Sequence, residues 1–586
     1  MTCHLHFTFG PVQCFVAQAR RTRDLYSGSF LLSWLAYTAM KAVDAAGGEI
    51  TLPGFAAVKK LVEAKKVKHG VAPNRFVAAF ADEQQVEQAA KAAANALQKE
   101  WRTIAEAVWE KFAAKAAPSG NDTAAIWKRQ IGNFWEIAWA IGGESETVLL
   151  GRRKNWRTPP LTIEGGDHCT LMGQYQELSG FVRSKEHVKQ NEFWKKIRGQ
   201  LRNKLNLDDD ERLCAIALVK RFFPEIANEI VGYELDADRW PSTVDLAAKP
   251  FFDKIKSNEK CVETLRDFPK FKGDHFGQYM NRAALANRKA TPFDDEDERG
   301  KYRDMLRTLE KAVNDRGGNF YALLLMDGDS MGKLIQDKPA ETVTGALTAF
   351  SAEAPKIVHK YDGVCVYAGG DDLFALLPLD MVLDCSVEVS KEYKKSFRKH
   401  QISEATISAA VIFAHYSVPL RQVIAQAHHF LDDVAKDATE RDAIAIAVLK
   451  PGGETCSWAK RFDRFQPTDA AENCFKPLID KFREEGGDID TLSSKFLYNL
   501  RRRFAVLEKD PSDFTADDLV SLFTAELIHG KLDKKPEKAR QEREMAKTLI
   551  GKLVDICLDA NTQKLDFDGA RLVRFLALDG KEGNDR

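Results

Sequence analysis

The sequence has no excess of charge of either sign. Its 586 residues include 86 Lys and Arg and 86 Asp and Glu, so the formal net charge is zero. A protein that holds nucleic acid with its whole surface is strongly basic, so this balance excludes histone-like and polybasic proteins. Any contact with a polyanion must come from local clusters of basic residues.

Long apolar runs and paired cysteines are also missing. The most apolar stretches, such as residues 30–40 and 320–326, are far shorter than the ~20 residues of a membrane span. The opening MTCHLHFTFG lacks the pattern of a secretory signal. The ten cysteines lie at least eleven residues apart, which excludes a Cys-x-x-Cys zinc ribbon or redox site. We therefore expect a cytoplasmic protein with reduced cysteines and no membrane contact.

The composition that is present indicates several folded α+β and helical domains. Apolar residues make up 44% and charged residues 29%, as in folded proteins, and the length suits about three or four domains. Residues 1–165 predict an α+β domain, with strands at 4–9, 75–80 and 133–141 and helices at 30–40 and about 82–116. Residues 166–300 predict a mostly helical domain ending in a linker at 287–299, and residues 456–586 a C-terminal helical domain.

Residues 301–455 predict a β-α-β-β-α-β domain. Strands are expected at 320–326, 364–368, 373–377, 406–414 and 443–449, with helices at 341–359, about 381–400 and 419–435. Pro355 is expected to kink or end the first of these helices early. This order is the ferredoxin-like arrangement, which also underlies nucleotide-polymerising palm domains.

Carboxylates gather at one edge of this predicted domain. The first strand ends in Asp327-Gly328-Asp329, and the hairpin turns at Gly369-Gly370-Asp371-Asp372. In the β-α-β-β order the end of the first strand lies beside the hairpin tip, so Asp327, with Asp329 as a further candidate, comes close to the hairpin carboxylates. Crowded carboxylates repel one another unless a cation neutralises them, and oxygen ligands without His or Cys suit Mg²⁺ or Mn²⁺.

We interpret Asp327, Asp371 and Asp372 as catalytic metal ligands. Two such ions can activate an attacking hydroxyl and stabilise a leaving pyrophosphate. The alternative is that Gly-Gly-Asp-Asp is only a polar hairpin turn, but the upstream Asp-Gly-Asp favours the metal site. The remaining candidates are for nucleotide binding: Gly328, Asp329, Ser330, Gly369, Gly370 and Lys436, with Lys333 as a weaker one.

Lys436 ends the third helix of the predicted domain, where it can face a triphosphate as a point charge. The alternative is a solvated lysine that complements the helix dipole. Three basic clusters can contact an RNA backbone or simply form solvated faces: Arg20-Arg21 with Arg23, Arg152-Arg153-Lys154 with Arg157, and Arg501-Arg502-Arg503.

Several motifs resemble one protein family. They are FGPVQCF (9–15), ARRTRDLYSGSFLLS (19–33), PNRF (73–76), RKNWR (153–157), ERLCAIALVKR (211–221), LLLMDGDSMGKL (323–334), YAGGDDLFALLP (367–378) and AHYSVPL (414–420). Together they resemble the large palm-polymerase/cyclase subunit of type III CRISPR effector complexes, specifically its Cmr (type III-B) branch.

The resemblance implies two ferredoxin-like palm domains, of which residues 1–165 form a degenerate one and only the second keeps GGDD. It implies synthesis of a cyclic oligoadenylate messenger from ATP when target RNA binds, as part of antiviral defence. Guide CRISPR RNA, target RNA and other Cmr-type subunits are the implied partners. On the family pattern, Asp371 and Asp372 match the GGDD carboxylates and Asp327 matches their partner.

Two departures from the family pattern limit what carries over. Many members begin with an HD nuclease domain, but here the Gly-Pro-Val-Gln motif starts at residue 10 and none of the 12 histidines precedes an Asp. We therefore expect no HD nuclease activity. Relatives often carry a Cys-x-x-Cys zinc site, whereas here Met172 follows Cys169 in that position, which argues against a four-cysteine zinc site.

Two other functions remain open from the residues. The first is a non-catalytic scaffold that holds guide and target RNA; the presence of all three carboxylates disfavours it. The second keeps the metal chemistry but transfers AMP from ATP to a small acceptor such as S-adenosylmethionine. The metal site would look the same in both transferases, so the sequence does not separate them.

Overall fold

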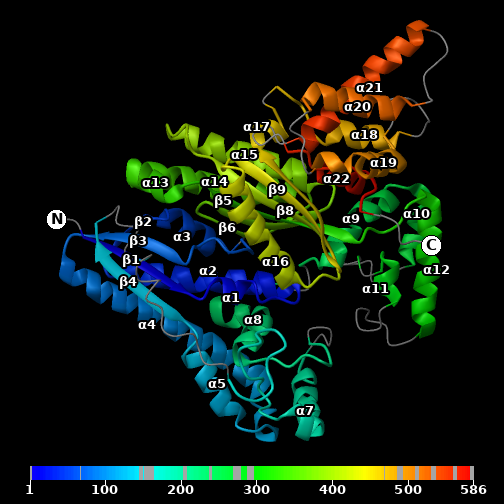
Figure 1. Cartoon of the computed structure of the whole chain (residues 1–586). Helices are drawn as coiled ribbons and strands as arrows, with labels where there is room; N and C mark the ends of the chain where they lie inside the picture. Colours follow the sequence, from blue (N-terminus) through cyan, green and yellow to red (C-terminus); the bar gives the residue numbers. More distant parts are fainter. Residues whose placement is uncertain are drawn as a thin grey trace.

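The computed structural model describes residues 3–65, 67–143, 150, 164–201, 207–235, 240–267, 277, 279–286, 296–467, 469–484, 492–508, 514–529, 536–558 and 564–580. Two β-sheets, each with its own helices, lie side by side (Figure 1), and helical segments pack against them from the right and from above. Among the described helices, none is both long enough and apolar enough to cross a bilayer.

The first sheet has the strand order β2-β3-β1-β4, with all neighbours antiparallel. Its strands are β1 (Cys3–Gly10), β2 (Glu49–Leu52), β3 (Arg75–Phe80) and β4 (Glu136–Gly142). Helices α2 (Thr22–Ala45) and α4 (Glu83–Val108) pack together over it. Alternate β1 residues Leu5, Phe7 and Phe9 join the helix residues in one buried core, as the two-residue period of a strand requires.

The remaining elements of this part are short. They are α1 (Gln13–Val16), α3 (Phe55–Glu63), α5 (Thr123–Gly132), a π-helical turn (Trp109–Ala113) and a 3-10 turn (Ala117–Ser119). The three predicted strands and both predicted helices are confirmed. The sequence reading missed β2, α3 and α5, because strands of four residues and helices of two or three turns show too few periods to detect.

The second sheet has six strands in the order β10-β9-β8-β5-β7-β6. They are β5 (Phe320–Gly328), β6 (Val364–Gly369), β7 (Asp372–Pro378), β8 (Ile407–His415), β9 (Ala443–Lys450) and β10 (Gly453–Arg461). Only β8 and β9 run parallel. The stretch β8-β5-β7-β6 repeats the order β4-β1-β3-β2 of the first sheet, so the predicted pair of ferredoxin-like units is present.

Helices cover both faces of the second sheet. One face packs on α14 (Ala340–Lys360) and α15 (Val382–Lys399), and the other on α16 (Leu420–His429) with a π-helical continuation (Phe430–Ala438). Along β5, residues such as Leu324 and Leu323 alternate between the two cores. The continuous apolar run of this strand follows from its burial on both sides.

Two expectations for this part are wrong. Helix α14 continues through Pro355 to Lys360, so this proline does not end it early. Residues after Pro451 and Gly452 do not turn helical at once, since β10 forms a hairpin with β9 and adds a sixth strand. A seven-residue helix, α13 (Met331–Asp337), follows the acidic end of β5.

The other helices form two groups beside the sheets. The middle group is α7 (Arg183–Arg198), α8 (Ala215–Val231), α9 (Thr243–Lys256), α10 (Glu259–Arg266), α11 (Arg282–Ala286) and α12 (Glu296–Val313). The C-terminal group is α17 (Phe462–Phe465), α18 (Lys476–Arg483), α19 (Ser494–Phe504), a 3-10 turn (Ala505–Glu508), α20 (Ala516–Ile528), α21 (Pro536–Cys557) and α22 (Asp568–Ala577).

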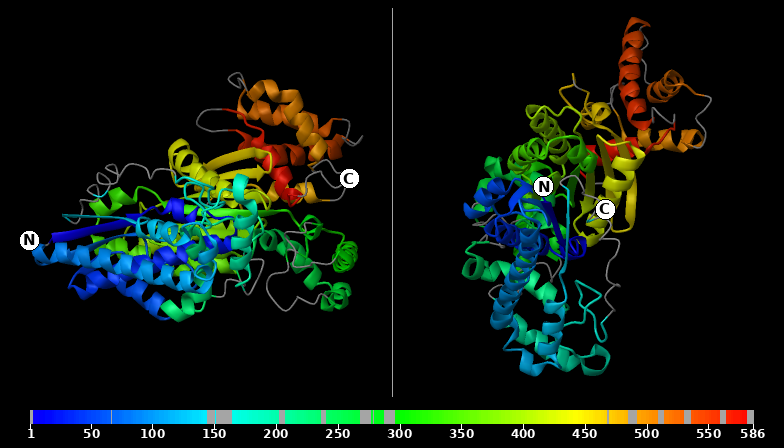
Figure 2. Two further views of the ribbon diagram at one scale, coloured as in Figure 1. Left: turned by 90° about the horizontal axis from the view of Figure 1, so that it is seen from below. Right: turned by 90° about the vertical axis from the view of Figure 1, so that its left-hand side faces the viewer.

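The middle group contacts elements of both sheets, and the C-terminal group lies beside the second sheet (Figure 2). Helix α8 packs on α2 and α4, α9 lies against β5 and β7, and α22 lies against β10. The C-terminal helices share one apolar core with the second sheet. Residues 287–295 of the predicted linker lie outside the described residues, and residues 296–299 begin α12.

Candidate active site

The end of β5 and the tip of the β6–β7 hairpin meet at one edge of the second sheet. Met326 pairs with Leu373 across β5 and β7, so Asp327 and Asp372, the next residues along each strand, lie side by side. Asp371 sits in the turn that joins β6 to β7. Each of the three aspartates offers an oxygen within 4.8 Å of the other two. The juxtaposition expected from the strand order is therefore present.

Two glycines shape this turn. Gly370 has a φ of +66°, in the left-handed region that favours glycine. A Cβ at Gly369 would lie 2.6 Å from the carbonyl oxygen of Val71, which belongs to the first sheet's β2–β3 connection. The Ser351 hydroxyl of α14 donates a hydrogen bond to the Gly370 carbonyl at 3.1 Å. The turn is thus held from both sides, and a Cβ at Gly370 would meet nothing within 4 Å.

The crowded carboxylates hold protons strongly. Burial, with the charge of Asp327 adding to it, raises the pKa of Asp371 to about 7. Asp372 is exposed at the start of β7, and desolvation together with its hydrogen bond to Asp327 raises its pKa well above its usual range. A site that retains protons at neutral pH for this reason would exchange them for a divalent cation, whose charge relieves the repulsion.

Lys436 reaches the same carboxylates from the π-helical segment after α16. Its Nζ donates to Oδ2 of Asp327, in a direct ion pair. Burial alone would lower the pKa of Lys436, but the Asp327 charge outweighs it and the pKa is raised. The lysine therefore stays charged beside the acidic group, and the solvated helix-end alternative does not describe its position.

Asp329 is not part of the three-carboxylate group. Its Oδ1 accepts from the Ser408 hydroxyl at 2.7 Å, and its Oδ2 accepts from the Thr406 hydroxyl at 2.8 Å and the Asp442 amide at 3.0 Å. The side chain is buried. Asp329 thus connects the end of β5 to β8 and to the residue before β9. It lies two residues after Asp327 but does not belong to the group of three carboxylates.

The other nucleotide-binding candidates surround the turn into α13. Ser330, with a φ of +54°, precedes α13, and its carbonyl accepts from the Lys333 amide at 2.9 Å. A Cβ at Gly328 would collide with the Tyr393 hydroxyl and lie 2.8 Å from Cβ of Asp371. Their roles in nucleotide binding, like the metal-binding roles of the three aspartates, stay predictions.

The edge strand that leads to this site is clasped by the first sheet's domain. The Gly70 amide donates to the Val366 carbonyl at 3.2 Å, and the Ala368 amide donates to the Gly70 carbonyl at 3.0 Å. The Ser29 hydroxyl of α2 donates to the same Val366 carbonyl at 2.8 Å. We call Gly70, Ser29 and their partners on β6 the Gly70 clasp.

The sequence carried a signal for this contact. Ser29 and Ser33 lie on the buried face of α2, where a hydroxyl needs a partner. The Ser33 hydroxyl accepts from the Val71 and Ala72 amides at 2.9 and 2.8 Å, next to Gly70. The two buried serines therefore marked a face of α2 that needs polar partners, but not which segment of the chain supplies them.

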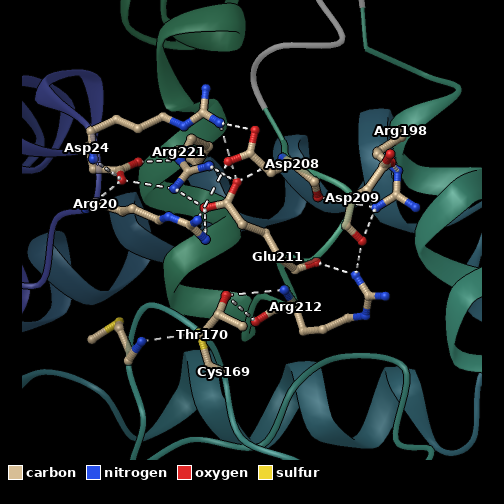
Figure 3. A network of polar contacts seen from close by, with 12 residues as sticks. Arg20, Asp24, Cys169, Thr170, Arg198, Asp208, Asp209, Glu211, Arg212 and Arg221 are labelled. Carbon is tan, nitrogen blue, oxygen red and sulfur yellow. Dashed lines mark hydrogen bonds and ion pairs between the residues drawn. The ribbon is translucent and has the colours of Figure 1, made fainter. Parts of the chain in front are cut away.

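The basic cluster near residue 20 takes part in a polar network within the chain (Figure 3). Arg221 is fully buried and pairs with both Asp24 and Glu211. Arg21 contacts Asp208 at 2.6 Å, and Arg20 lies 3.8 Å from Asp208 and from Glu211. This network joins the start of α2 to the segment before α8, which is a structural role for the cluster.

Of the other two basic clusters, the structure describes only the one at residues 501–503. Residues 152–157 lie outside the described residues. Arg501, Arg502 and Arg503 are exposed near the end of α19, and Arg503 pairs with Glu526 at 2.7 Å.

Two distant cysteines meet beside this network. The Cys169 and Cys214 thiols are in hydrogen-bond contact and both are buried. The Met172 amide donates to Sγ of Cys169 at 3.2 Å, and the Ala217 amide to Sγ of Cys214 at 3.4 Å. Met172 and Ala217 thus stand where a Cys-x-x-Cys pair has its second cysteine. The sequence reading recognised the first of these two patterns and missed the second.

Comparisons with known proteins agree with this architecture. Residues 320–445 match the family model "Cas10/Cmr2, second palm domain", and residues 4–106 match "CRISPR-associated protein Cmr2, N-terminal". The CRISPR system Cmr subunit Cmr2 of Pyrococcus furiosus is 27% identical in an alignment of 289 residues that covers 42% of this chain and 33% of that protein. The alignment thus spans about a third of the length of this curated relative.

Two solved structures share the fold. A type III-B Cmr-beta structure in the apo state has a TM-score of 0.59 at 15% identity, covering 95% of this chain and 81% of the other. A Cmr-beta structure bound to cognate target RNA has a TM-score of 0.60 at 15% identity, covering 95% and 83%.

The fold and the acidic edge together define a palm-domain protein of the Cas10/Cmr2 class. Within that class, the Cmr2 N-terminal model that matches residues 4–106 and the relative from Pyrococcus furiosus both indicate the Cmr2 branch. The chain is similar, over residues 4–106 and 320–445, to the Cmr2-type large subunits of type III-B CRISPR systems.

Proposed function

We propose that this chain is the target-RNA-activated nucleotidyltransferase of a type III-B antiviral complex and that it joins ATP into cyclic oligoadenylate. The observation that carries the proposal is the convergence of Asp327, Asp371 and Asp372 within 4.8 Å at the hairpin tip. A palm domain with three carboxylates at this edge has the ligands for metal-dependent nucleotidyl transfer. This chemistry makes phosphodiester bonds and releases pyrophosphate.

The donor set fits Mg²⁺ or Mn²⁺. All three side chains offer oxygen, and the pKa values of Asp371 and Asp372 are raised by desolvation and by the nearby charge of Asp327, which a cation would offset. A bound divalent ion would polarise the attacked phosphate and lower the pKa of the attacking hydroxyl. The protein's part is to hold the three oxygens on two strands and a tight turn, so that little rearrangement is needed on binding.

Lys436 would hold the triphosphate in this reaction. Its Nζ already lies against Asp327, at the entrance that a metal-bound phosphate must share. When a cation takes over the charge of Asp327, the ammonium is released to pair with a phosphate oxygen as a point charge. Gly369 and Gly370 allow the phosphates to approach the turn backbone, and Gly328 and Ser330 border the same space.

RNA would regulate the reaction by aligning the two domains. A neutral chain has weak affinity for free RNA, so we propose that it works docked on guide RNA and other Cmr-type subunits. One ATP would bind at the acidic edge and the second would be presented by the first sheet's domain. A misplacement of about 1 Å can cost on the order of a hundredfold in rate, so target RNA needs only to bias this alignment.

The test is to measure ATP consumption by the purified chain, by the guide-loaded complex and by the complex with matched target RNA, with products identified by mass spectrometry. Cyclic oligoadenylate made only with target RNA is the expected result. An adenylylated small molecule would assign the transfer to another acceptor, and absence of turnover in all three would leave the scaffold role. We also propose that this chain supplies no HD-type DNase, because none of its histidines precedes an Asp.

A further inference from the structure

Tyr393, on the buried face of α15, has a hydroxyl without a hydrogen-bond partner. The side chain is fully buried, and no described group lies within hydrogen-bond reach of its Oη. The ring packs edge-on against Phe350 with centroids 4.9 Å apart and lies 4.6 Å from Phe397. A ring held between two aromatic neighbours cannot swing its hydroxyl to a distant partner. A buried donor left in this state is destabilising, so it calls for an explanation.

The hydroxyl points at the acidic site. A Cβ built on Gly328 would collide with Oη of Tyr393 and would lie 3.1 Å from Oδ2 of Asp371. Oη and the Asp371 carboxylate therefore border the same small space, and that space stays open because residue 328 is a glycine. Burial, with the charges of Asp371 and Asp327 adding to it, raises the pKa of Tyr393 well above its usual value, so the phenol keeps its proton and remains a donor.

A second buried tyrosine shows what is particular to Tyr393. Tyr321, on β5 of the same sheet, is also fully buried and also has no partner for its hydroxyl. It belongs to the apolar core on the opposite face of the sheet, and burial alone raises its pKa. The two tyrosines thus differ in surroundings: one hydroxyl ends among apolar groups and the other ends beside the metal-ligand candidates.

We propose that Tyr393 is a positioning residue that donates a hydrogen bond from Oη to the Asp371 carboxylate when a divalent cation is bound. The inference rests on the proposed metal-dependent function of this site. Outer donors that orient a ligating carboxylate typically contribute about ten- to hundredfold to metal affinity. In the metal-free chain the Tyr393 hydroxyl is unpaired, which destabilises the folded state. The hydrogen bond to Asp371 that forms with bound metal removes this destabilisation.

The test uses the full-length chain and Mn²⁺ as the probe, with binding measured by electron paramagnetic resonance of free Mn²⁺ and by calorimetry. Tyr393→Phe removes only the hydroxyl, and Tyr321→Phe is the matched control with the same chemical change. We expect Mn²⁺ binding about tenfold weaker in Tyr393→Phe and unchanged in Tyr321→Phe. Without metal, both variants should melt at or above the temperature of the unmodified chain, because each loses an unpaired buried hydroxyl.

Three results would overturn the inference in distinguishable ways. Equal Mn²⁺ affinity in Tyr393→Phe and the unmodified chain removes the role of Tyr393 and leaves the proposed function standing. A lower melting temperature of metal-free Tyr393→Phe shows that the hydroxyl has a structural partner, which also refutes the inference. If the unmodified chain binds Mn²⁺ no better than Asp371→Asn, the metal site itself is absent, and both this inference and the proposed function fail.

Discussion

The four strands of the first sheet and the stretch β8-β5-β7-β6 of the second have the same order but differ at one connection. In the second sheet, β6 and β7 are joined by a tight turn that carries Asp371 and begins β7 with Asp372. In the first sheet, the equivalent strands β2 and β3 are joined by a long connection that contains α3. The equivalent first strand, β1, ends at Gly10 without a carboxylate, whereas β5 ends at Asp327 and Gly328. The shared topology therefore places the end of the first strand beside the connection between the two neighbouring strands in both domains. Only in the second domain do the residues at this place form the group of three carboxylates.

The long connection has a function of its own in the structure. Near one end, the Thr51 carbonyl accepts a hydrogen bond from the Thr344 hydroxyl of α14 at 2.8 Å. Near the other end, Gly70 pairs with β6 through the Gly70 clasp. The element that forms the acidic tip in one domain thus forms the contact surface in the other. We infer that the first domain holds the second domain's hairpin in place through these contacts.

The largest effect is expected from removing the carboxylates that distinguish the second domain. Asp371→Ala with Asp372→Ala should abolish cyclic product formation, by about a thousandfold or more, because electrostatic stabilisation of the transferring phosphate depends on them. Assembly and RNA binding should persist, since a hairpin tip contributes little to either core. Product synthesis and complex formation are measured in parallel, with Glu353→Ala, an exposed acidic residue on α14, as the control. Undiminished synthesis in the double variant would refute the palm assignment.

The next effect concerns the contact between the domains. In Gly70→Ala the new Cβ would lie 2.7 Å from the Ser29 hydroxyl and 2.9 Å from the Tyr367 ring, which forces the clasp apart. We expect synthesis by the target-bound complex to fall at least about tenfold, since alignment errors below 1 Å are costly. Mn²⁺ affinity should change little, because the three ligands remain on one domain.

Gly132→Ala is the matched control for the clasp, because a Cβ there meets nothing within 4 Å. Equal synthesis by the two alanine variants would show that the clasp does not position the site. A loss of Mn²⁺ affinity equal to the loss of synthesis would instead indicate that the clasp supports the hairpin itself.

Whether a contact could be predicted from the sequence depends on how far apart its residues lie along the chain. The meeting of Asp327 with Asp371 and Asp372 could be predicted, because strand order fixes which strand ends are neighbours. The Gly70 clasp could not, because it joins residues almost three hundred positions apart across two domains. The Cys169–Cys214 contact could not be predicted either, because each cysteine stands alone in its segment without a Cys-x-x-Cys pattern. Tyr393 belonged to a regular apolar pattern on α15, and nothing in its spacing separated a core tyrosine from one aimed at the site.

A smaller effect is expected from the lysine that only the second domain carries at its site. Lys436→Met keeps most of the side chain's length and apolar contacts but removes the charge next to Asp327. We expect the KM for ATP to rise by about tenfold, the size of one charge-assisted contact to phosphate, with a smaller change in kcat. Steady-state synthesis at varied ATP measures both. Lys356→Met, at an exposed position on α14, is the control, and a KM in Lys436→Met equal to that of the control would remove Lys436 from nucleotide binding.

The smallest effect is a dependence of stability on pH that arises at the acidic edge of the second sheet. Asp371 has a pKa raised to about 7 in the folded chain, against 3.8 when unfolded. Between these values the folded state binds the extra proton, so the stabilising contribution of this group is complete below about pH 4 and is lost as the pH rises to about 7.

Metal-free Asp371→Asn should therefore gain in melting temperature relative to the unmodified chain as the pH is raised from 5 to about 8, with saturating Mn²⁺ reducing the difference. Melting curves of both proteins, recorded over that range with and without Mn²⁺, measure it. A difference between them that is independent of pH would mean that Asp371 is ionised throughout, and the crowding argument for this edge of the sheet would then be wrong.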